Sequence, residues 1–221
     1  MALIYAVGPI TAGSEDGGLG QSEVIEGPRL ARAVREAAND SAIKAIVLRV
    51  DSPGGSAVGS DYVWREVERA RARKPVVVSM SDVAGSGGYW ISMAASAIVA
   101  QPSTLTGSIG VVYGSFNVLP PLAWAGVTVD TEKFGANADL LSPYRSRSPE
   151  QLERISGWMQ QVYTDFVGKV ARGRQLDPKV VEPLAHGRVW LGSEAQPRKL
   201  VDQLGGLELA LRIAREKAGL K

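Results

Sequence analysis

Cysteine is absent from the 221 residues of this chain, and histidine occurs once, as His186. The absence of cysteine excludes disulfide scaffolds, thiol nucleophiles and cysteine-ligated zinc sites. A single histidine leaves no room for a histidine-rich metal site. Net charge is also small, because 25 Lys and Arg residues stand against 23 Asp and Glu residues. This balance argues against a nucleic-acid-binding protein, and we expect no nucleic acid, metal or cofactor as a partner.

Long apolar runs are missing as well. No stretch of the sequence is long and apolar enough for a membrane span, and the N-terminal segment 1–7 is too short and lacks the basic residues of a signal peptide. We therefore expect any membrane anchor to lie outside this chain. What is present is typical of a globular protein, with 45% hydrophobic and 22% charged residues. At this length a chain buries roughly 70% of its unfolded surface and needs no metal or disulfide to fold.

Apolar runs without polar alternation, which are typical of buried strands, alternate with segments of helical periodicity. We expect strands over residues 2–7, 42–50, 75–80, 97–100, 109–113 and 127–131, and helices over residues 28–38, 58–73, 86–97, 150–170 and 207–218. This alternation predicts an α/β fold with a mostly parallel sheet, in a single domain over residues 1–221. Two irregular segments are expected, a turn at residues 81–85 and a flexible Gly-rich loop at residues 8–22.

Ser86 lies between an expected strand and an expected helix, in the sequence VAGSGGYW. Its hydroxyl would lie at the positive end of the helix dipole, and Gly87 would let a backbone N–H face a substrate. Acyl transfer requires a nucleophile beside a free N–H, because the carbonyl that is attacked becomes an oxyanion. The same residues also fit an N-cap serine with two packing glycines, so the motif alone leaves both interpretations open.

A second glycine turn, DSPGGS at residues 51–56, follows the preceding apolar strand. Loops at the carboxyl ends of neighbouring parallel strands share one edge of the sheet, where ligands bind. We therefore expect Gly54 and Gly55 near Ser86, where one of them could supply a second N–H to an oxyanion. Taken alone, Ser-Pro-Gly-Gly is also an ordinary tight turn.

A serine nucleophile needs a base, and the sequence does not choose one. His186, in a Gly-flanked loop, is more typical of a structural or solvated histidine. A buried lysine can also act as a base, and Lys74 and Lys133 are candidates. We expect Lys74 at the wrong edge of the sheet, since it precedes a strand, and Lys133 at the right edge, since it follows residues 127–131.

Four segments in a fixed order carry a resemblance to a known family. They are DSPGGS at residues 51–56, AGSGGYWIS at 84–92, PSTLTGSIG at 102–110 and GRVW at 187–190. Together they resemble signal peptide peptidase A, a family of membrane-associated bacterial serine peptidases with the Clp protease/crotonase fold. The resemblance extends from about residue 4 to the C-terminus. It implies a parallel sheet with flanking helices and a long C-terminal helical region.

The resemblance also implies roles for individual residues in a Ser/Lys dyad. Ser86 corresponds to the nucleophile, Gly55 and Gly87 to the oxyanion donors, and Ser108 to the serine that orients the lysine amine. The residues implied to line the substrate cleft and to offer a strand edge to an extended peptide are Val111, Val112 and Tyr113.

The sequence departs from the family pattern at Ala138, where short members have the general-base lysine. Alanine cannot accept a proton, so the isolated chain is expected to be poorly active or inactive. Long members contain two copies of the domain, with the serine in the C-terminal copy and the lysine in the N-terminal copy. The chain resembles such a C-terminal copy, and the alternative is a short enzyme whose lysine has been replaced.

The resemblance implies an endopeptidase that degrades remnant signal peptides and other unfolded apolar peptides. The implied partners are further copies in a ring or an N-terminal homologous half, and a membrane reached through a segment outside this chain. The implied location is the cytoplasmic membrane, with the catalytic domain on its extracytoplasmic side. Three alternatives stay open: a phage-type capsid or scaffold protease, a crotonase-like acyl-coenzyme-A enzyme, and an assembly module without its own catalysis.

Overall fold

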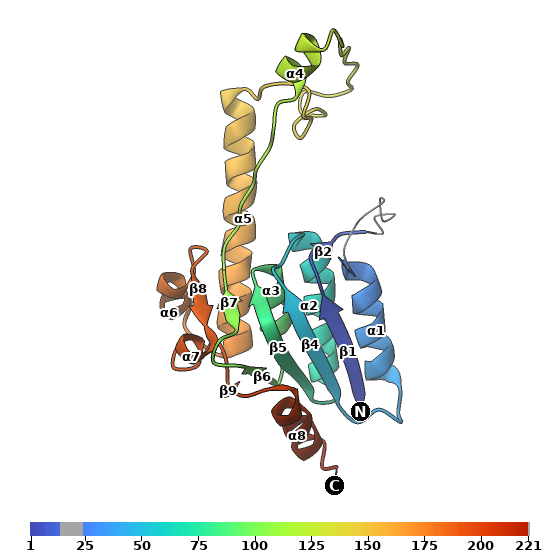
Figure 1. Ribbon diagram of the computed structural model, residues 1–221, viewed down its shortest axis with the longest axis vertical. Coiled ribbons are helices and arrows are strands. Elements are labelled where there is room, and N and C mark those ends of the chain that lie inside the picture. The colour runs from blue at the N-terminus through green and yellow to red at the C-terminus, as the bar shows by residue number, and fades with distance from the viewer. Residues whose placement is uncertain (14–23, 221) are drawn as a thin grey trace. The chain divides into compact units, whose positions relative to one another are not determined.

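The centre of the fold is a sheet whose middle strands are buried on both faces. Its strands lie side by side in the order β1 (Ala2–Val7), β4 (Ile46–Ser52), β5 (Val76–Gly85), β6 (Ala97–Ala100) and β9 (Gln203–Leu204) (Figure 1). These pairs are parallel. Ile46, Val47 and Leu48 are fully buried, as expected for an apolar run without polar alternation.

The computed structural model describes residues 1–13 and 24–220, which form two compact units. Unit 1 comprises Met1–Gly110 and Asp165–Lys221, and unit 2 comprises Val111–Thr164. The prediction of a single domain over residues 1–221 stays a prediction. Of the predicted flexible loop at residues 8–22, residues 14–22 lie outside the described residues. Its first part is not entirely loop, because β2 (Ile10–Thr11) pairs in parallel with β3 (Ile25–Glu26).

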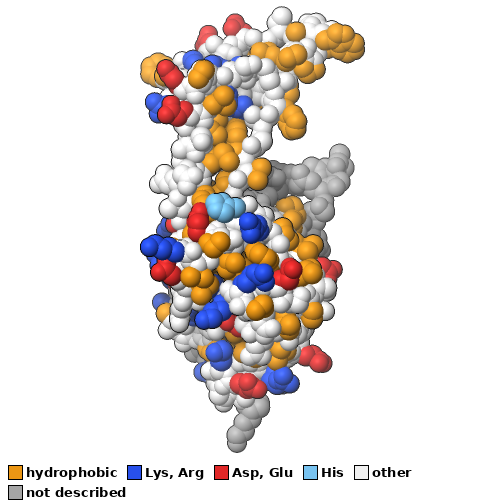
Figure 2. Space-filling view, turned by 90° about the vertical axis from the view of Figure 1, so that its left-hand side faces the viewer, with side chains coloured by type: hydrophobic (Ala, Val, Ile, Leu, Met, Phe, Trp, Pro, Cys, Tyr) orange, Lys and Arg blue, Asp and Glu red, His pale blue; other side chains and the backbone are white. Residues whose placement is uncertain are grey.

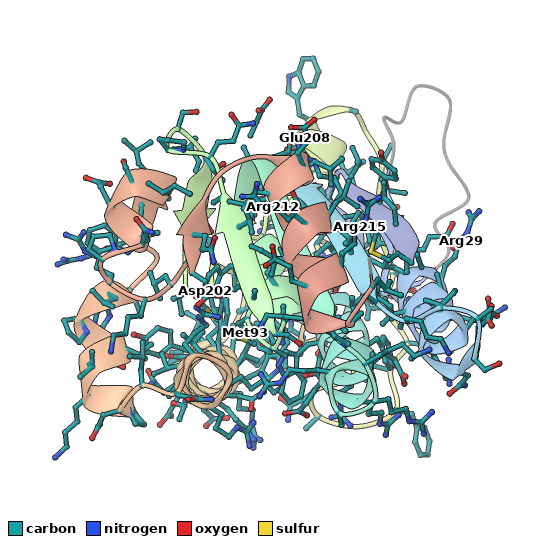
Figure 3. All side chains as sticks on the ribbon, turned by 90° about the horizontal axis from the view of Figure 1, so that it is seen from below. Arg29, Met93, Asp202, Glu208, Arg212 and Arg215 are labelled. Carbon is teal, nitrogen blue, oxygen red and sulfur yellow. The ribbon has the colours of Figure 1, made fainter. Side chains whose placement is uncertain are left out.

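Helices cover both faces of the sheet in unit 1. One face is covered by α1 (Gly27–Asn39), α2 (Ala57–Arg71) and α3 (Gly87–Ser92), and the other by α8 (Leu207–Lys217) (Figure 3). The apolar side of α8 packs on Val47, Val77 and Val99 of three adjacent strands. The remaining helices are α4 (Leu119–Trp124), α5 (Pro149–Arg174), α6 (Pro178–Val181), the 3-10 helix η1 (Glu182–Leu184) and α7 (Gly192–Ala195). None of the helices among the described residues has the length and apolar character needed to cross a membrane.

Strand β5 continues through the segment predicted to be a turn. Its register against β4 runs from Val50 opposite Met80 to Ser52 opposite Ala84, so β5 contains extra residues at this point. The carboxylate of Asp51 accepts the N–H of Val83 at 3.2 Å beside this irregularity. Residues 77–79 of β5 pair with β6, whereas residues 83–85 pair with β7 (Leu105–Gly107). The predicted turn at residues 81–85 is therefore wrong, because pairing with β7 supplies hydrogen bonds that local sequence does not reveal.

Three other local predictions were wrong. The helix expected over residues 86–97 ends at Ser92, and the chain turns there to enter β6. The strands expected over residues 109–113 and 127–131 are absent, and these segments are irregular in the described structure. Both have β-branched residues, but a strand also needs a hydrogen-bonded neighbour. Instead of the strand expected over residues 109–113, the chain forms β7 a few residues earlier. β7 lies between β5 and the antiparallel strand β8 (Val189–Leu191).

Lys74 connects the end of α1 to the start of β5. Its ammonium donates to the carbonyls of Ala37 at 3.1 Å, Asp40 at 2.7 Å and Ile43 at 2.6 Å. The last carbonyls of a helix have no partner within the helix, and a cation there also faces the negative end of the helix dipole. Lys74 is therefore a cap for α1.

Replacing this cap should destabilise the fold. We expect Lys74→Met to lower the free energy of unfolding by about 2 kcal/mol, because hydrogen bonds from a charged donor are lost while apolar packing is kept. Urea denaturation followed by circular dichroism measures the change. The control is Lys179→Met, at an exposed position whose side chain has no hydrogen bond or ion pair among the described residues. It should stay within about 0.5 kcal/mol of the parent. Equal effects of the two substitutions would contradict the capping role.

Candidate active site

Ser86 follows the last residue of β5 and is the N-cap of α3. Its backbone has φ 51° and ψ −116°, a region that residues other than glycine rarely adopt. Two hydrogen bonds hold it there: its N–H donates to the carbonyl of Gly107 at 2.9 Å, and its carbonyl accepts the N–H of Trp90 at 2.9 Å. The side chain is half-buried. Such backbone strain costs about 1–3 kcal/mol and is concentrated at functional sites.

The two glycine turns predicted to share a sheet edge are in contact. A β-carbon added at Gly54, where φ is 104°, would lie 2.6 Å from the nitrogen of Gly87 and 2.8 Å from the β-carbon of Ser86. A β-carbon added at Gly87 would lie 3.2 Å from the nitrogen of Gly55. Among the loop and cap hydrogen bonds of the described residues, none uses the amide of Gly55 or of Gly87. Ser86 therefore lies where the two glycine turns meet, close to the amides of Gly55 and Gly87.

Ser108 lies at the end of the neighbouring strand. Gly85 and Gly107 are opposite each other in the β5–β7 pair, so Ser86 and Ser108 are the next residues of the two strands. Ser108 also has a positive φ of 49°, and its N–H donates to the carbonyl of Arg188 at 2.7 Å. A β-carbon added at Gly85 would lie 3.5 Å from the β-carbon of Ser108. The structure thus brings the two serines predicted as site residues to one edge of the sheet.

The other predicted site residues belong to unit 2. Ala138 is exposed in a turn, and its N–H donates to the carbonyl of Gly135 at 3.4 Å. Val111, Val112 and Tyr113 lie in a segment without a strand partner among the described residues. The hydroxyl of Tyr113 accepts a hydrogen bond from Arg147 at 2.9 Å.

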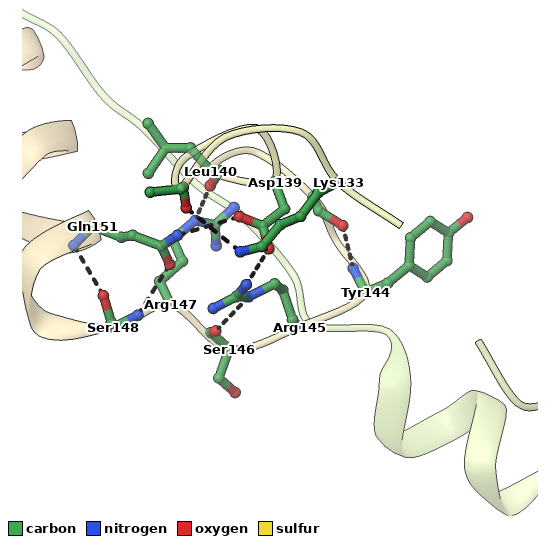
Figure 4. Close-up of polar contacts among 11 residues, drawn as sticks. Lys133, Asp139, Leu140, Tyr144, Arg145, Ser146, Arg147, Ser148 and Gln151 are labelled. Atoms are coloured by element: carbon green, nitrogen blue, oxygen red, sulfur yellow. Dashed lines mark hydrogen bonds and ion pairs between the residues drawn. The ribbon is translucent and has the colours of Figure 1, made fainter. Parts of the chain in front are cut away.

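Asp139, the residue after Ala138, organises the polar contacts of unit 2 (Figure 4). Its buried carboxylate accepts from Lys133 at 3.0 Å, from Gln151 at 3.4 Å and from Arg145. The hydrogen bond from Lys133 and the nearby charge of Arg145 hold the pKa of Asp139 below its ordinary value. Sequence analysis did not identify Asp139, although two of its three partners are cations within six residues of it.

Three basic residues that could have served as a base have other partners. Lys74 caps α1, and Lys133 donates to the carboxylate of Asp139. His186 is exposed, with its Nε2 3.3 Å from Glu182, and Figure 2 shows the histidine at the surface. The structure assigns none of the three to Ser86.

Two glycine substitutions should change stability in opposite directions. Gly54→Ala should lower the free energy of unfolding by at least about 2 kcal/mol, because its β-carbon would overlap the backbone of Gly87 at a positive φ. Gly168→Ala should raise it by about 0.5–1 kcal/mol, because this position is inside helix α5 with open space around its β-carbon. Urea denaturation measures both. A neutral Gly54→Ala would mean that the two turns do not pack as described.

Asp139 should make stability depend on pH in the acid range. Because its pKa is lowered in the folded state, its contribution is present above the unfolded pKa of about 3.9 and is lost as pH falls through the folded value. The difference in unfolding free energy between the parent and Asp139→Asn should therefore shrink as pH falls from 6 to below about 3. Denaturant titrations at several pH values measure it. Asp130→Asn, at an exposed site without an ion pair among the described residues, should show no such trend.

Comparisons with known proteins identify the family of this chain. A profile of Peptidase family S49 matches residues 68–221. The chain is 42% identical to Serine protease SPPA, chloroplastic, of Arabidopsis thaliana, over 87% of this chain and 28% of that protein. It is 42% identical to Protease 4 of Salmonella typhi, over 100% of this chain and 35% of that protein. The chain thus spans about a third of these relatives.

A shorter relative and a solved structure agree with this result. Putative signal peptide peptidase SppA of Enterococcus faecium is 38% identical over 78% of this chain and 50% of that protein. A ClpP1 mutant from Listeria monocytogenes has a TM-score of 0.60 at 12% sequence identity, and the likeness covers 95% of this chain and 94% of that chain. This likeness confirms the predicted α/β fold of the Clp protease type. The chain belongs to peptidase family S49, and its relatives confirm the predicted resemblance to signal peptide peptidase A.

Proposed function

We propose that this chain is the serine-bearing part of a serine peptidase that cuts unfolded, apolar peptides. The observation that carries the proposal is the strained backbone of Ser86 beside the amides of Gly55 and Gly87. Membership of a peptidase family supports the same function. Strain at a nucleophile is retained where it serves chemistry, because an unstrained serine would make a more stable turn.

The chemistry proceeds through an acyl-enzyme. A neutral lysine takes the proton of Ser86 Oγ as this oxygen attacks the peptide carbonyl. The N–H groups of Gly55 and Gly87 donate to the oxyanion that forms. The lysine ammonium then gives its proton to the leaving amine, and water hydrolyses the ester with the lysine again acting as base. Ser108 orients the amine through a hydrogen bond from its side chain.

The lysine comes from a homologous half of a longer protein. Ala138 cannot supply it, and Lys133 is bound to Asp139. Exposed apolar side chains in unit 2 support a contact with such a partner, because large exposed apolar groups are typical of interaction sites. The most exposed are Val112 at 95%, Phe116 at 85%, Trp124 at 91% and Phe134 at 104%.

The substrates are remnant signal peptides and other unfolded peptides, cut at the extracytoplasmic side of the cytoplasmic membrane. The names of relatives such as Putative signal peptide peptidase SppA support the substrate class. Residues 111–113 have no strand partner among the described residues, so their backbone is available to pair with an extended peptide. A folded protein cannot present its backbone in this way.

Covalent labelling tests the nucleophile. A fluorophosphonate should attach to Ser86, identified by mass spectrometry, in the chain together with its homologous half or in its own oligomer. Ser86→Ala should abolish labelling, whereas His186→Ala should leave the rate within twofold. Labelling at another serine, or none at all in the assembled protein, would refute the proposed function and favour an enzyme without a serine nucleophile.

Restoring a lysine tests the identity of the base. Ala138→Lys should raise kcat/KM for an apolar peptide at least about 100-fold over the isolated parent, the effect expected of a positioned general base. Ala138→Met, with a side chain of similar length and no amine, is the control and should have no effect. A gain in both variants, or in neither while Ser86 is still labelled, would mean that the base does not act from this position.

A further inference from the structure

Lys169 is a buried cation that the proposed mechanism does not use. It lies on α5, 5% exposed, and its ammonium donates to the carboxylates of Asp61 on α2, at 2.6 Å, and Asp165 on α5. Burying an ammonium is unfavourable unless it is paired with an opposite charge. Removing one partner of a buried ion pair destabilises a protein more than replacing the whole pair by apolar residues. A charge placed here therefore constrains the elements around it.

The same ammonium lies over two indole rings. It is 4.5 Å from the ring centroid of Trp64 on α2 and 4.9 Å from that of Trp90 on α3. The face of an indole ring attracts a cation, and the attraction is strongest where water is excluded. Phe166 packs against the ring of Trp90, and the centroids of these two rings are 4.3 Å apart. Lys169 thus connects three helices through one positive charge.

Neither indole ring is oriented by a hydrogen bond among the described residues. The indole Nε1 atoms of Trp64 and Trp90 are buried and lack a hydrogen-bond partner among the described residues. A buried N–H without an acceptor is unfavourable, and most buried side-chain donors have a partner. Neither ring therefore gains a hydrogen bond from its orientation. Both rings contact the ammonium of Lys169, Trp90 also packs on Phe166, and the guanidinium of Arg172 lies 5.8 Å from the ring centroid of Trp64.

Trp90 carries this constraint to the site. Its backbone N–H donates to the carbonyl of Ser86 at 2.9 Å, which closes the first turn of α3. The same turn presents the amide of Gly87 beside Gly54 and Gly55. A displacement of the Trp90 ring would therefore move the serine and one oxyanion donor together.

We propose that Lys169 is a positioning residue for Ser86, acting through the ring of Trp90. This inference rests on the proposed function for its catalytic consequence. The structural claim is that the charge of Lys169 holds the first turn of α3, and with it the positive φ of Ser86. Lys169 touches neither substrate nor the reacting atoms in this role.

Two Lys→Met substitutions distinguish a positioning role of Lys169 from a general loss of fold stability. Lys169→Met removes the charge between the indoles, and Lys74→Met removes a charge that caps α1. Hydrogen exchange of the Trp90 amide, followed by NMR, should accelerate in Lys169→Met at least tenfold more than its loss of unfolding free energy accounts for. In Lys74→Met the acceleration should not exceed what the loss of unfolding free energy accounts for. Under the same native conditions, the rate of fluorophosphonate labelling at Ser86 should fall at least tenfold in Lys169→Met alone.

A milder pair of variants covers the case in which Lys169→Met does not fold. Lys169→Arg keeps a cation that can stack on indole and should recover at least part of the labelling rate. Asp61→Asn removes one carboxylate from Lys169 and should accelerate exchange at Trp90 in the same direction by a smaller factor. Arg65 also pairs with Asp61, so Arg65→Met is the control that leaves Lys169 in place and should have no effect on exchange at Trp90.

The outcomes distinguish this inference from the proposed function. Parent-like exchange and labelling in Lys169→Met, or equal effects in Lys74→Met, would refute the positioning role while Ser86 remains the nucleophile. If the parent itself is not labelled at Ser86, the proposed function fails, and exchange at Trp90 still decides whether Lys169 holds α3. Faster exchange with an unchanged labelling rate would also overturn the proposal, because the turn would then move without consequence for the serine.

Discussion

The structure depends on how β5 ends. Its lower half is an ordinary parallel strand beside β6, but its last residues pair with β7, and the N–H of Ser86 donates to the carbonyl of Gly107. This exchange of neighbours occurs within one sheet, and Ser86, the residue after the strand, has a positive φ there. Without the hydrogen bond to Gly107, nothing local would favour this backbone, because serine at φ 51° is strained. The strain is therefore maintained by tertiary pairing.

Glycine then determines which groups can approach the serine. The backbone of Gly54 lies so close to Ser86 and Gly87 that no side chain fits between the two turns. This approach is what places two amides on one side of a hydroxyl. At Trp90, three residues after Gly87 along α3, the packing is of another kind, with an ammonium over two indole rings. The start of α3 thus has close backbone packing at its glycines and a buried charge at Trp90.

Elements with strong periodicity were predictable, because neighbours in sequence determine them. The apolar runs of β4 and β6 and the amphipathic pattern of α5 appear in the structure with small differences in their bounds. The end of β5, the position of β7 and the short α3 were not predictable, since each depends on hydrogen bonds between distant segments. Residues 81–85 have the composition of a turn and become a strand through β7.

The candidate site was also predictable only in part. The parallel-sheet rule predicted that the turns containing Gly54 and Ser86 would meet, whereas the roles of Ser108 and Ala138 came from resemblance and stay predictions. Lys169 was missed, although it interrupts the apolar face of α5 between Phe166 and Val170. A charge at such a position is the signal that could have identified it.

The division of residues between the two units bears on how such a protein evolves. Ser86 belongs to unit 1 and Ala138 to unit 2, so each is held by contacts within its own unit. Local packing at one position is therefore separate from local packing at the other. On the proposed mechanism, a duplicated gene would keep the alcohol in one copy and the amine in the other. Each copy would then need its sibling for catalysis without any change to the contacts around its own remaining group.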